Sequence, residues 1–182
     1  FFFFFLCEVQ VLVTLISSDP EIMPDSMACL AASAALAVSD VPIKEIISEV
    51  RVSRVNGQFV VNPTRSEMEK SDMDFLIAAT DKNLMMVEGE AKECSEADLC
   101  KALEIAHDAI RIQVKAQEEL RDMAGAKPKR DYTKPATDEA LKTKVYAFAQ
   151  QKVYEVAKGG LSKHERTDRF DAIKVELTEY LK

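Results

Sequence analysis

Hydrophobic and polar residues alternate with period two over several short stretches in the first half of the chain, and this pattern predicts β-strands. Asn56-Gly57 separates two of these stretches and is a strong signal for a tight hairpin turn. Asp81-Lys82 separates another two and predicts a second hairpin. The strands are expected at residues 8–18, 46–55, 58–62, 73–80 and 83–90.

Helical periodicity appears between and after these strands. An alanine-rich stretch is expected to start at Asp25 as N-cap. A much longer helix is expected to start at Ser95, with Asp98 completing a capping box, and to end at Gly125. Its predicted buried stripe consists of Leu99, Leu103, Ala106, Ile110 and Val114. The expected helices cover residues 25–39, 66–71, 95–124, 137–157 and 162–181.

This order of elements predicts an α+β fold, in which a mostly antiparallel sheet is covered by helices over residues 8–124. A basic, proline-containing linker is expected at 125–136, followed by an all-helical part at 137–182. Two helices rarely bury enough surface to stand alone, so this part is expected to be a truncated domain. Residues 1–7, with the run Phe1–Phe5, are interpreted as an artefactual or disordered start.

Charge is distributed unevenly along the 182 residues. The net charge of −7 argues against nucleic-acid binding by the whole chain, yet residues 125–182 carry +4 and residues 1–124 carry −11. In the linker, cations and an aromatic ring could contact RNA phosphates and bases. The alternative is a solvated linker that its prolines and charges keep extended. The candidate RNA-binding residues are Lys127, Lys129, Arg130, Tyr132 and Lys134.

The four cysteines show no paired spacing, which is typical of reduced thiols in a cytosolic protein. A zinc site from Cys94, Cys100 and His107 is disfavoured, because Cys100 and His107 would lie about 10 Å apart along one helix. The chain shows no membrane segment, since the apolar run at its start is too short to span a bilayer.

Glu88, Glu90 and Glu93 form a carboxylate cluster near the end of the last predicted strand. Carboxylate oxygens bind hard cations, so a metal site is one interpretation of this cluster. A solvated strand end is the other, and the sequence favours it.

Four motifs occur in register along the chain: SSDPEIMPD, ASAALAVSD, VNGQFVVNPT and MVEGEAKECSE. On these motifs, the sequence resembles the polynucleotide phosphorylases, which are bacterial phosphorolytic exoribonucleases (polyribonucleotide nucleotidyltransferases). Members of that family have two related RNase PH-like cores separated by an all-helical domain. Residues 8–124 resemble the later half of the first core, and residues 125–182 resemble the start of the helical domain.

The resemblance implies that the phosphorolytic site belongs to the second core, where serines at a helix N-terminus bind phosphate. The corresponding loop here holds Met23, Pro24 and Asp25. Proline has no N–H, and the carboxylate of Asp25 already occupies the positive end of the helix, so we expect a poor phosphate site.

The family's metal site gives the same expectation. Its Asp, Asp and Lys positions fall on Met68, Asp74 and Leu76 here, so Asp74 is the only remnant. Asp72 is expected on the same strand face as Asp74, but two carboxylates there make a weak site. No catalytic residue and no bound metal are therefore expected in this chain.

The resemblance implies a part of a phosphate-dependent 3′-to-5′ exoribonuclease that degrades RNA to nucleoside diphosphates. The parent enzyme is expected to need Mg²⁺, to bind RNA, to form a homotrimer and to be cytoplasmic without membrane attachment. This segment is expected to be the degenerate, non-catalytic core, with a scaffold or RNA-path role. The alternative is a stand-alone RNA-binding or structural scaffold domain without a catalytic partner.

Overall fold

The structure is a computed structural model that describes residues 8–133 and 136–182. It divides into two compact units, Phe1–Thr133 and Lys134–Lys182. The interpretation of residues 1–7 as an artefactual start falls outside the described residues.

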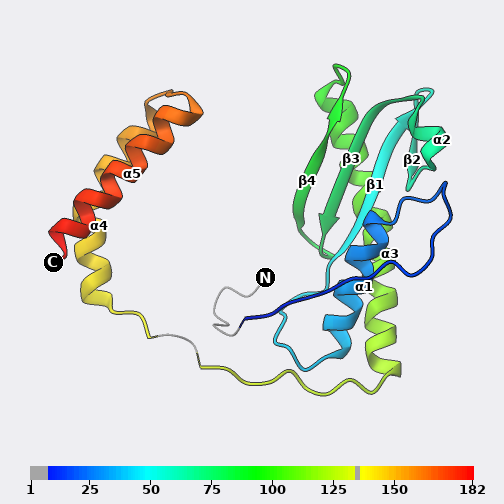
Figure 1. The fold of residues 1–182 in the computed structure, drawn as a ribbon, viewed down its shortest axis with the longest axis horizontal. Helices are drawn as coiled ribbons and strands as arrows, with labels where there is room; N and C mark the ends of the chain where they lie inside the picture. Colours follow the sequence, from blue (N-terminus) through cyan, green and yellow to red (C-terminus); the bar gives the residue numbers. More distant parts are fainter. Residues whose placement is uncertain (1–7, 134–135) are drawn as a thin grey trace. The chain divides into compact units, whose positions relative to one another are not determined.

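Unit 1 contains a four-stranded antiparallel sheet with the strand order β2-β1-β3-β4 (Figure 1). Both predicted hairpins are confirmed. Asn56 and Gly57 have φ angles of 51° and 79°, as a two-residue type I′ turn requires. The strands are β1 (Ser48–Val55), β2 (Gln58–Val61), β3 (Ser71–Ala79) and β4 (Leu84–Ala91).

The helices of unit 1 are α1 (Asp25–Val38), α2 (Arg65–Met68) and α3 (Glu96–Met123). The Ser95 hydroxyl accepts a hydrogen bond from the Asp98 N–H at 3.1 Å and so caps α3. At the other end, Gly125 has φ 60°, and the Ala126 N–H donates to the Arg121 carbonyl, which is a Schellman ending. The predicted long helix is thus confirmed.

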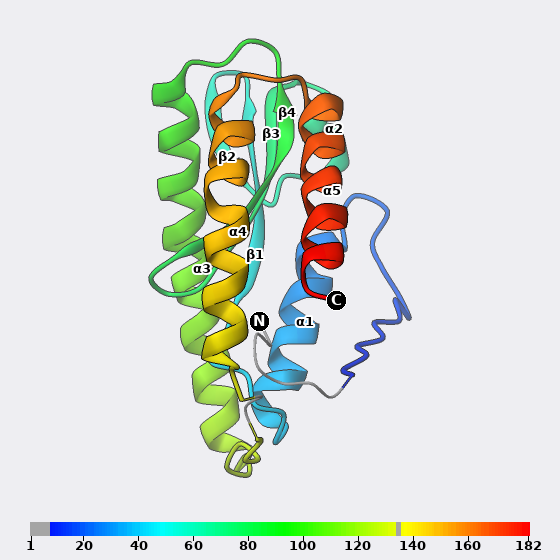
Figure 2. The ribbon, with the colours of Figure 1, turned by 90° about the vertical axis from the view of Figure 1, so that its left-hand side faces the viewer.

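The core lies between α3 and one face of the sheet, with α1 packed against β1 and α3 (Figure 2). The α3 stripe is rotated relative to the prediction: Leu99 and Leu103 are half-buried, and smaller residues take the centre. Alanine there lets the helix approach the sheet closely. The buried α3 residues are Ala102, Ala106, Ile110, Val114 and Gln117.

The strand predicted at residues 8–18 is wrong. These residues form no regular secondary structure, and the side chains of Leu12 and Ile16 are 82% and 94% exposed. A strand needs a neighbour for its backbone hydrogen bonds, and neither edge of the four-stranded sheet pairs with this segment. The alternating pattern of hydrophobic and polar residues is therefore present, but the segment has no partner strand among the described residues.

Asp25 is not the N-cap of α1. Pro24 holds that position without a side-chain hydrogen bond, and Asp25 is the first helical residue. Its carboxylate accepts a hydrogen bond from the Ser26 N–H at 2.8 Å and turns towards β1, where it has a stronger partner in Arg51.

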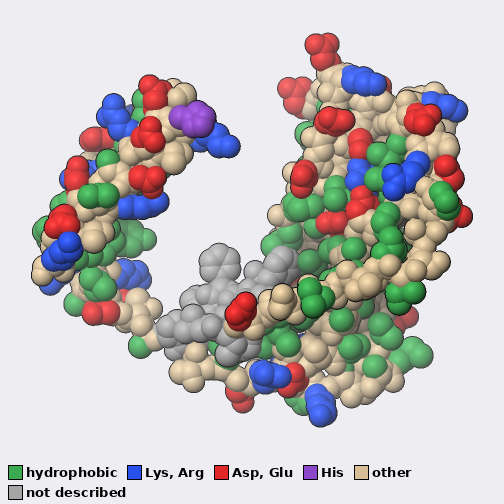
Figure 3. Space-filling model, viewed as in Figure 1, with side chains coloured by type: hydrophobic (Ala, Val, Ile, Leu, Met, Phe, Trp, Pro, Cys, Tyr) green, Lys and Arg blue, Asp and Glu red, His purple; other side chains and the backbone are tan. Residues whose placement is uncertain are grey.

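Unit 2 is a hairpin of α4 (Glu139–Lys158) and α5 (Lys163–Tyr180), as predicted. Phe148 and Tyr180 stack with ring centroids 4.6 Å apart. Ile173 is the one buried residue among those of the two helices. Figure 3 shows acidic and basic side chains interspersed over the hairpin, with hydrophobic side chains exposed between them.

Candidate functional site

The loop before α1 is held in place by α2. The Glu21 carboxylate accepts hydrogen bonds from the Ser66 hydroxyl at 2.6 Å and from its N–H at 3.1 Å. The Arg65 N–H donates to the Glu21 carbonyl at 2.9 Å. These contacts fix the path of the chain towards Met23 and Pro24, and they bring the start of α1 to β1.

Arg51 on β1 joins two carboxylates from different elements. Its guanidinium pairs with Asp25 at the start of α1 and, at 2.5 Å, with Asp74 on β3. The Ser53 hydroxyl donates to the other oxygen of Asp74 at 3.0 Å. The side chains of Arg51, Asp25 and Asp74 are 15%, 29% and 22% exposed, so water screens the pairs only in part.

The ionisation of these groups follows from this geometry. Burial alone would raise the pKa of Asp25, but hydrogen bonds from Arg51 and Ser26 hold it below its ordinary value. Burial alone would lower the pKa of Arg51. The hydrogen bonds and charges of the two carboxylates outweigh burial and raise this pKa. Glu49 lies two residues before Arg51 in β1 and so on the same face. Its pKa is raised because of burial and the nearby negative charge of Asp25.

Arg51 therefore supplies the positive charge that a divalent ion would otherwise supply between Asp25 and Asp74. A cation binding there would have to displace a guanidinium that is already hydrogen-bonded to both carboxylates. An anion at the start of α1 would meet the carboxylate of Asp25. The arrangement holds the start of α1, β1 and β3 together by charge.

Asp72 does not share a face with Asp74, contrary to the prediction. The register between β1 and β3 shifts at Arg54/Val55: Met73 lies opposite Arg54 and Ser71 opposite Val55, so Asp72 is bulged. Its carboxylate binds Arg54 at 2.8 Å, and Arg54 also binds Asp98 of α3 at 2.8 Å. The hydrogen bond from Arg54 lowers the pKa of Asp72.

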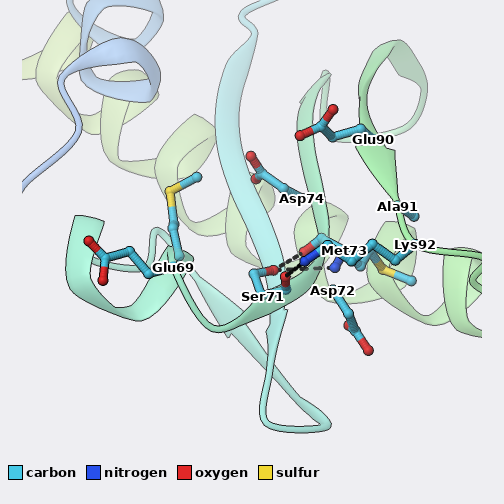
Figure 4. Close-up of a pocket in the computed structure, with 9 residues that line it drawn as sticks. Glu69, Ser71, Asp72, Met73, Asp74, Glu90, Ala91 and Lys92 are labelled. Carbon is cyan, nitrogen blue, oxygen red and sulfur yellow. Dashed lines mark hydrogen bonds between the residues drawn. The ribbon is translucent and has the colours of Figure 1, made fainter.

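A pocket of about 310 Å³ lies beside β3. Met68 and Asp74, two of the three positions aligned with the family's metal site, line it together, and Leu76 does not. A thioether thus stands beside Asp74 where the family has a second carboxylate. Figure 4 shows the carboxylates of Asp74 and Asp72 pointing in different directions.

The other candidate metal ligands have other partners or lie apart. His107 lies on α3 with its Nε2 3.0 Å from the Thr80 carbonyl, Cys94 is half-buried and Cys100 is exposed. Glu88 and Glu90 lie on β4, opposite Leu76 and Asp74. Within residues 8–133 and 136–182, no three histidine, cysteine or acidic side chains are arranged to hold a metal ion.

The candidate RNA-binding residues have different environments in the structure. Lys129 donates to three backbone carbonyls, and Arg130 pairs with Asp40 at 2.6 Å. Lys127 is exposed and Tyr132 is half-buried. Lys134 lies outside the described residues.

Arg51 was not among the residues that the sequence predicts to be functional. The available signal is weak: an arginine in a strand otherwise rich in valine, on the face that also carries Glu49 and Ser53. Its two partners lie 26 and 23 residues away in the sequence. The antiparallel pairing of β1 with β3 brings Asp74 to Arg51, and Asp25 reaches it from the start of α1.

Residues 45–109 match the 3′ exoribonuclease family, domain 2. Over 93% of its length, the chain is 49% identical to a polyribonucleotide nucleotidyltransferase of Christiangramia forsetii and 51% identical to one of Bacteroides fragilis, covering 23% and 24% of those proteins. One of Cytophaga hutchinsonii is 44% identical over 97% of the chain and 25% of its own length.

The chain therefore spans about a quarter of the length of the curated relatives that it matches. Among solved structures, an archaeal exosome core has a distant similarity, with a TM-score of 0.37 and 21% identity over 44% of this chain and 32% of that one. None of the described helices is both long and apolar enough to cross a bilayer. Over the stretch that it spans, the chain is a member of the polyribonucleotide nucleotidyltransferase family, and its α+β unit contains domain 2 of the 3′ exoribonucleases.

Proposed function

We propose that this chain is the non-catalytic part of a phosphate-dependent 3′-to-5′ exoribonuclease that releases nucleoside diphosphates from RNA. Residues 8–124 correspond to the later half of its first RNase PH-like core, and residues 137–182 to its helical domain. The parent protein acts as a cytoplasmic homotrimer with Mg²⁺. The role of this segment is to support the assembly and the path of the RNA.

The observation that carries this proposal is the guanidinium of Arg51 between Asp25 and Asp74. Phosphoryl transfer needs a bound divalent cation and a place for the attacking phosphate. Here a side chain of the protein already neutralises the carboxylates, and the start of α1 carries its own negative charge. Both features favour a structural role for Asp25, Arg51 and Asp74.

An RNA path needs cations that face the solvent and lie along an accessible strip of chain. Lys127 meets this requirement among the described residues of the linker, since Lys129 and Arg130 are engaged within unit 1. The proposed contribution to RNA binding is therefore weak and electrostatic. It should decrease steeply as the salt concentration rises.

Two measurements on the 182-residue chain test the proposal. Incubation with poly(A), inorganic phosphate and Mg²⁺ should release no ADP, and clear release would overturn the non-catalytic assignment. Fluorescence anisotropy with a labelled oligoadenylate should show weak binding at low salt that Lys127→Met reduces. Absence of any RNA binding at low salt would overturn the RNA-path role and leave the structural scaffold.

Magnesium binding gives a third, independent test of the role of Arg51. Titration calorimetry with Mg²⁺ should show no saturable heat for this chain, because Arg51 occupies the space between the two aspartates. A saturable signal that Asp74→Asn removes would contradict the proposed role of Arg51.

A further inference from the structure

The C-terminal end of α1 receives an unusual partner from the linker. The Lys129 ammonium donates to the carbonyls of Leu36 at 2.8 Å, Ala37 at 3.1 Å and Ser39 at 2.8 Å. The last carbonyls of a helix have no partner within it and carry its negative partial charge. An ammonium has three N–H donors, so these three contacts match its full donor capacity.

The neighbouring residue adds a second attachment. The Arg130 guanidinium pairs with the Asp40 carboxylate at 2.6 Å, and the Arg130 N–H donates to the Asp40 carbonyl at 2.8 Å. The last turn of α1 contains no basic residue of its own. The linker thus brings the cation that this helix end lacks, from about 90 residues further along the sequence.

We propose that Lys129 and Arg130 form a latch that fastens the interdomain linker to the C-terminal end of α1. The chain then leaves unit 1 beside Asp40 and not where α3 ends at Gly125. The latch sets the point from which the following helical unit is tethered.

The latch also changes which residues are available to other partners. The ammonium of Lys129 faces carbonyl oxygens at the end of α1, and Lys129 is half-buried. Burial and the nearby positive charge of Arg121 lower the pKa of Lys129, as expected for a cation that has exchanged water for carbonyl oxygens. Lys127, two residues earlier, is exposed and serves as a matched control.

Hydrogen exchange of the full 182-residue chain tests the latch. Lys129→Met keeps an unbranched side chain one atom shorter and removes its donors. It should speed exchange of the Arg130 amide and of the amides at the end of α1 by about tenfold or more, the effect of losing charge-assisted hydrogen bonds. Lys127→Met should leave these amides at the wild-type rate. Unchanged exchange in Lys129→Met would overturn the latch.

A second variant covers the case in which Lys129→Met disturbs folding. Asp40→Asn removes only the charged partner of Arg130 and should speed exchange of the Arg130 amide, with little effect at the far end of the sheet. If both variants exchange like the wild type, no latch exists.

RNA binding separates the latch from the proposed RNA path. With a labelled oligoadenylate at low salt, Lys127→Met should weaken binding and Lys129→Met should not. An equal loss in both variants would mean that Lys129 faces RNA, and it would overturn the latch. If the chain binds no RNA at all, the exchange measurements still decide the latch by themselves.

Discussion

Arg51 of β1 links the start of α1 to β3 through two carboxylates. It donates to Asp25 and Asp74 and is 15% exposed. Both carboxylates depend on it for neutralisation, since Ser53 contributes one neutral hydrogen bond to Asp74. Removing the guanidinium would leave two partly buried negative charges side by side.

We therefore expect Arg51→Met to lower the free energy of unfolding by about 2–3 kcal/mol. This lies at and below the lower end of the range of about 3–5 kcal/mol for breaking a buried ion pair, because these groups are partly solvated. Lys101 pairs with Glu104 on the exposed side of α3, and Lys101→Met should change stability by less than about 0.5 kcal/mol. Urea denaturation measures both variants. Equal effects would show that the Arg51 pairs are no stronger than surface pairs.

Glu49 gives a prediction for pH. Burial and the charge of Asp25 raise its pKa above the ordinary 4.5, so its ionised form opposes folding at neutral pH. We expect Glu49→Gln to stabilise the chain at pH 7 by less than about 1 kcal/mol, because solvent screens a partly exposed group. The gain should shrink as the pH falls through the raised pKa, where folded Glu49 takes up its proton first.

Stability measured between pH 7 and 4.5 for the wild type and Glu49→Gln tests this sign. A difference that stays constant over this range would contradict the assignment.

Asp25 acts in the opposite direction. Its lowered pKa means that its contribution is present above the ordinary value of 3.8 and is lost as the pH falls through the folded pKa.

Among the strands, β4 depends on one glycine. A Cβ atom added at Gly89 would lie 2.1 Å from the Asp74 carbonyl and 2.7 Å from the Phe75 Cα, which are both backbone atoms that cannot turn aside. Gly89 lies opposite Phe75 in the register between β3 and β4. The close approach of these two strands therefore requires glycine at this position.

Gly89→Ala should destabilise unit 1 by about 1–3 kcal/mol, the usual range for an overpacked site. Glu88→Ala, at the exposed neighbouring position, should change stability by less than about 0.5 kcal/mol. Thermal unfolding followed by circular dichroism compares the two. A Gly89→Ala variant as stable as the wild type would show that β4 can shift away from β3 at no cost.

Elements with local signals were predictable from the sequence, and those that need a distant partner were not. The turn at Asn56-Gly57, the cap at Ser95 and the ending at Gly125 each depend on a few neighbouring residues, and all three are confirmed. Residues 8–18 have a clear alternating pattern but form no strand, because pairing is decided elsewhere in the chain.

The same distinction applies to the candidate site. From the sequence, Asp25 was predicted as an N-cap and Asp74 as a remnant of the family's metal site, and no local pattern connects the two through Arg51. Lys129 was visible as a cation in a linker, but its carbonyl partners lie at the end of a helix about 90 residues earlier. A contact over that separation leaves no local pattern to detect.

In the whole molecule, the two-helix hairpin at the C-terminal end has little buried surface to stabilise it. One residue of its helices, Ile173, is buried, while Tyr146, Tyr154 and Val175 are 59%, 57% and 65% exposed. Side-chain caps at Asp138 and Ser162 define where each helix starts. Capping sets the ends of a helix without supplying the buried surface that stabilises it.

A peptide of residues 136–182 should therefore show partial helicity that decreases gradually on heating, without a cooperative transition. Circular dichroism between low and high temperature measures this. A steep unfolding transition at micromolar concentration, independent of concentration, would show that the hairpin folds by itself.

The bulge in β3 has a consequence for comparing proteins by their motifs. Side chains of a regular strand alternate, so two aspartates separated by one residue would ordinarily project together. The extra residue at Asp72 sends the two carboxylates to separate arginines, although the letters Asp-Met-Asp are unchanged. The spacing of two residues in a sequence shows that they share a strand face only where the backbone pleat is uninterrupted. Where a strand contains such a bulge, a sequence alignment alone will predict metal sites from pairs of acidic residues that point to different faces.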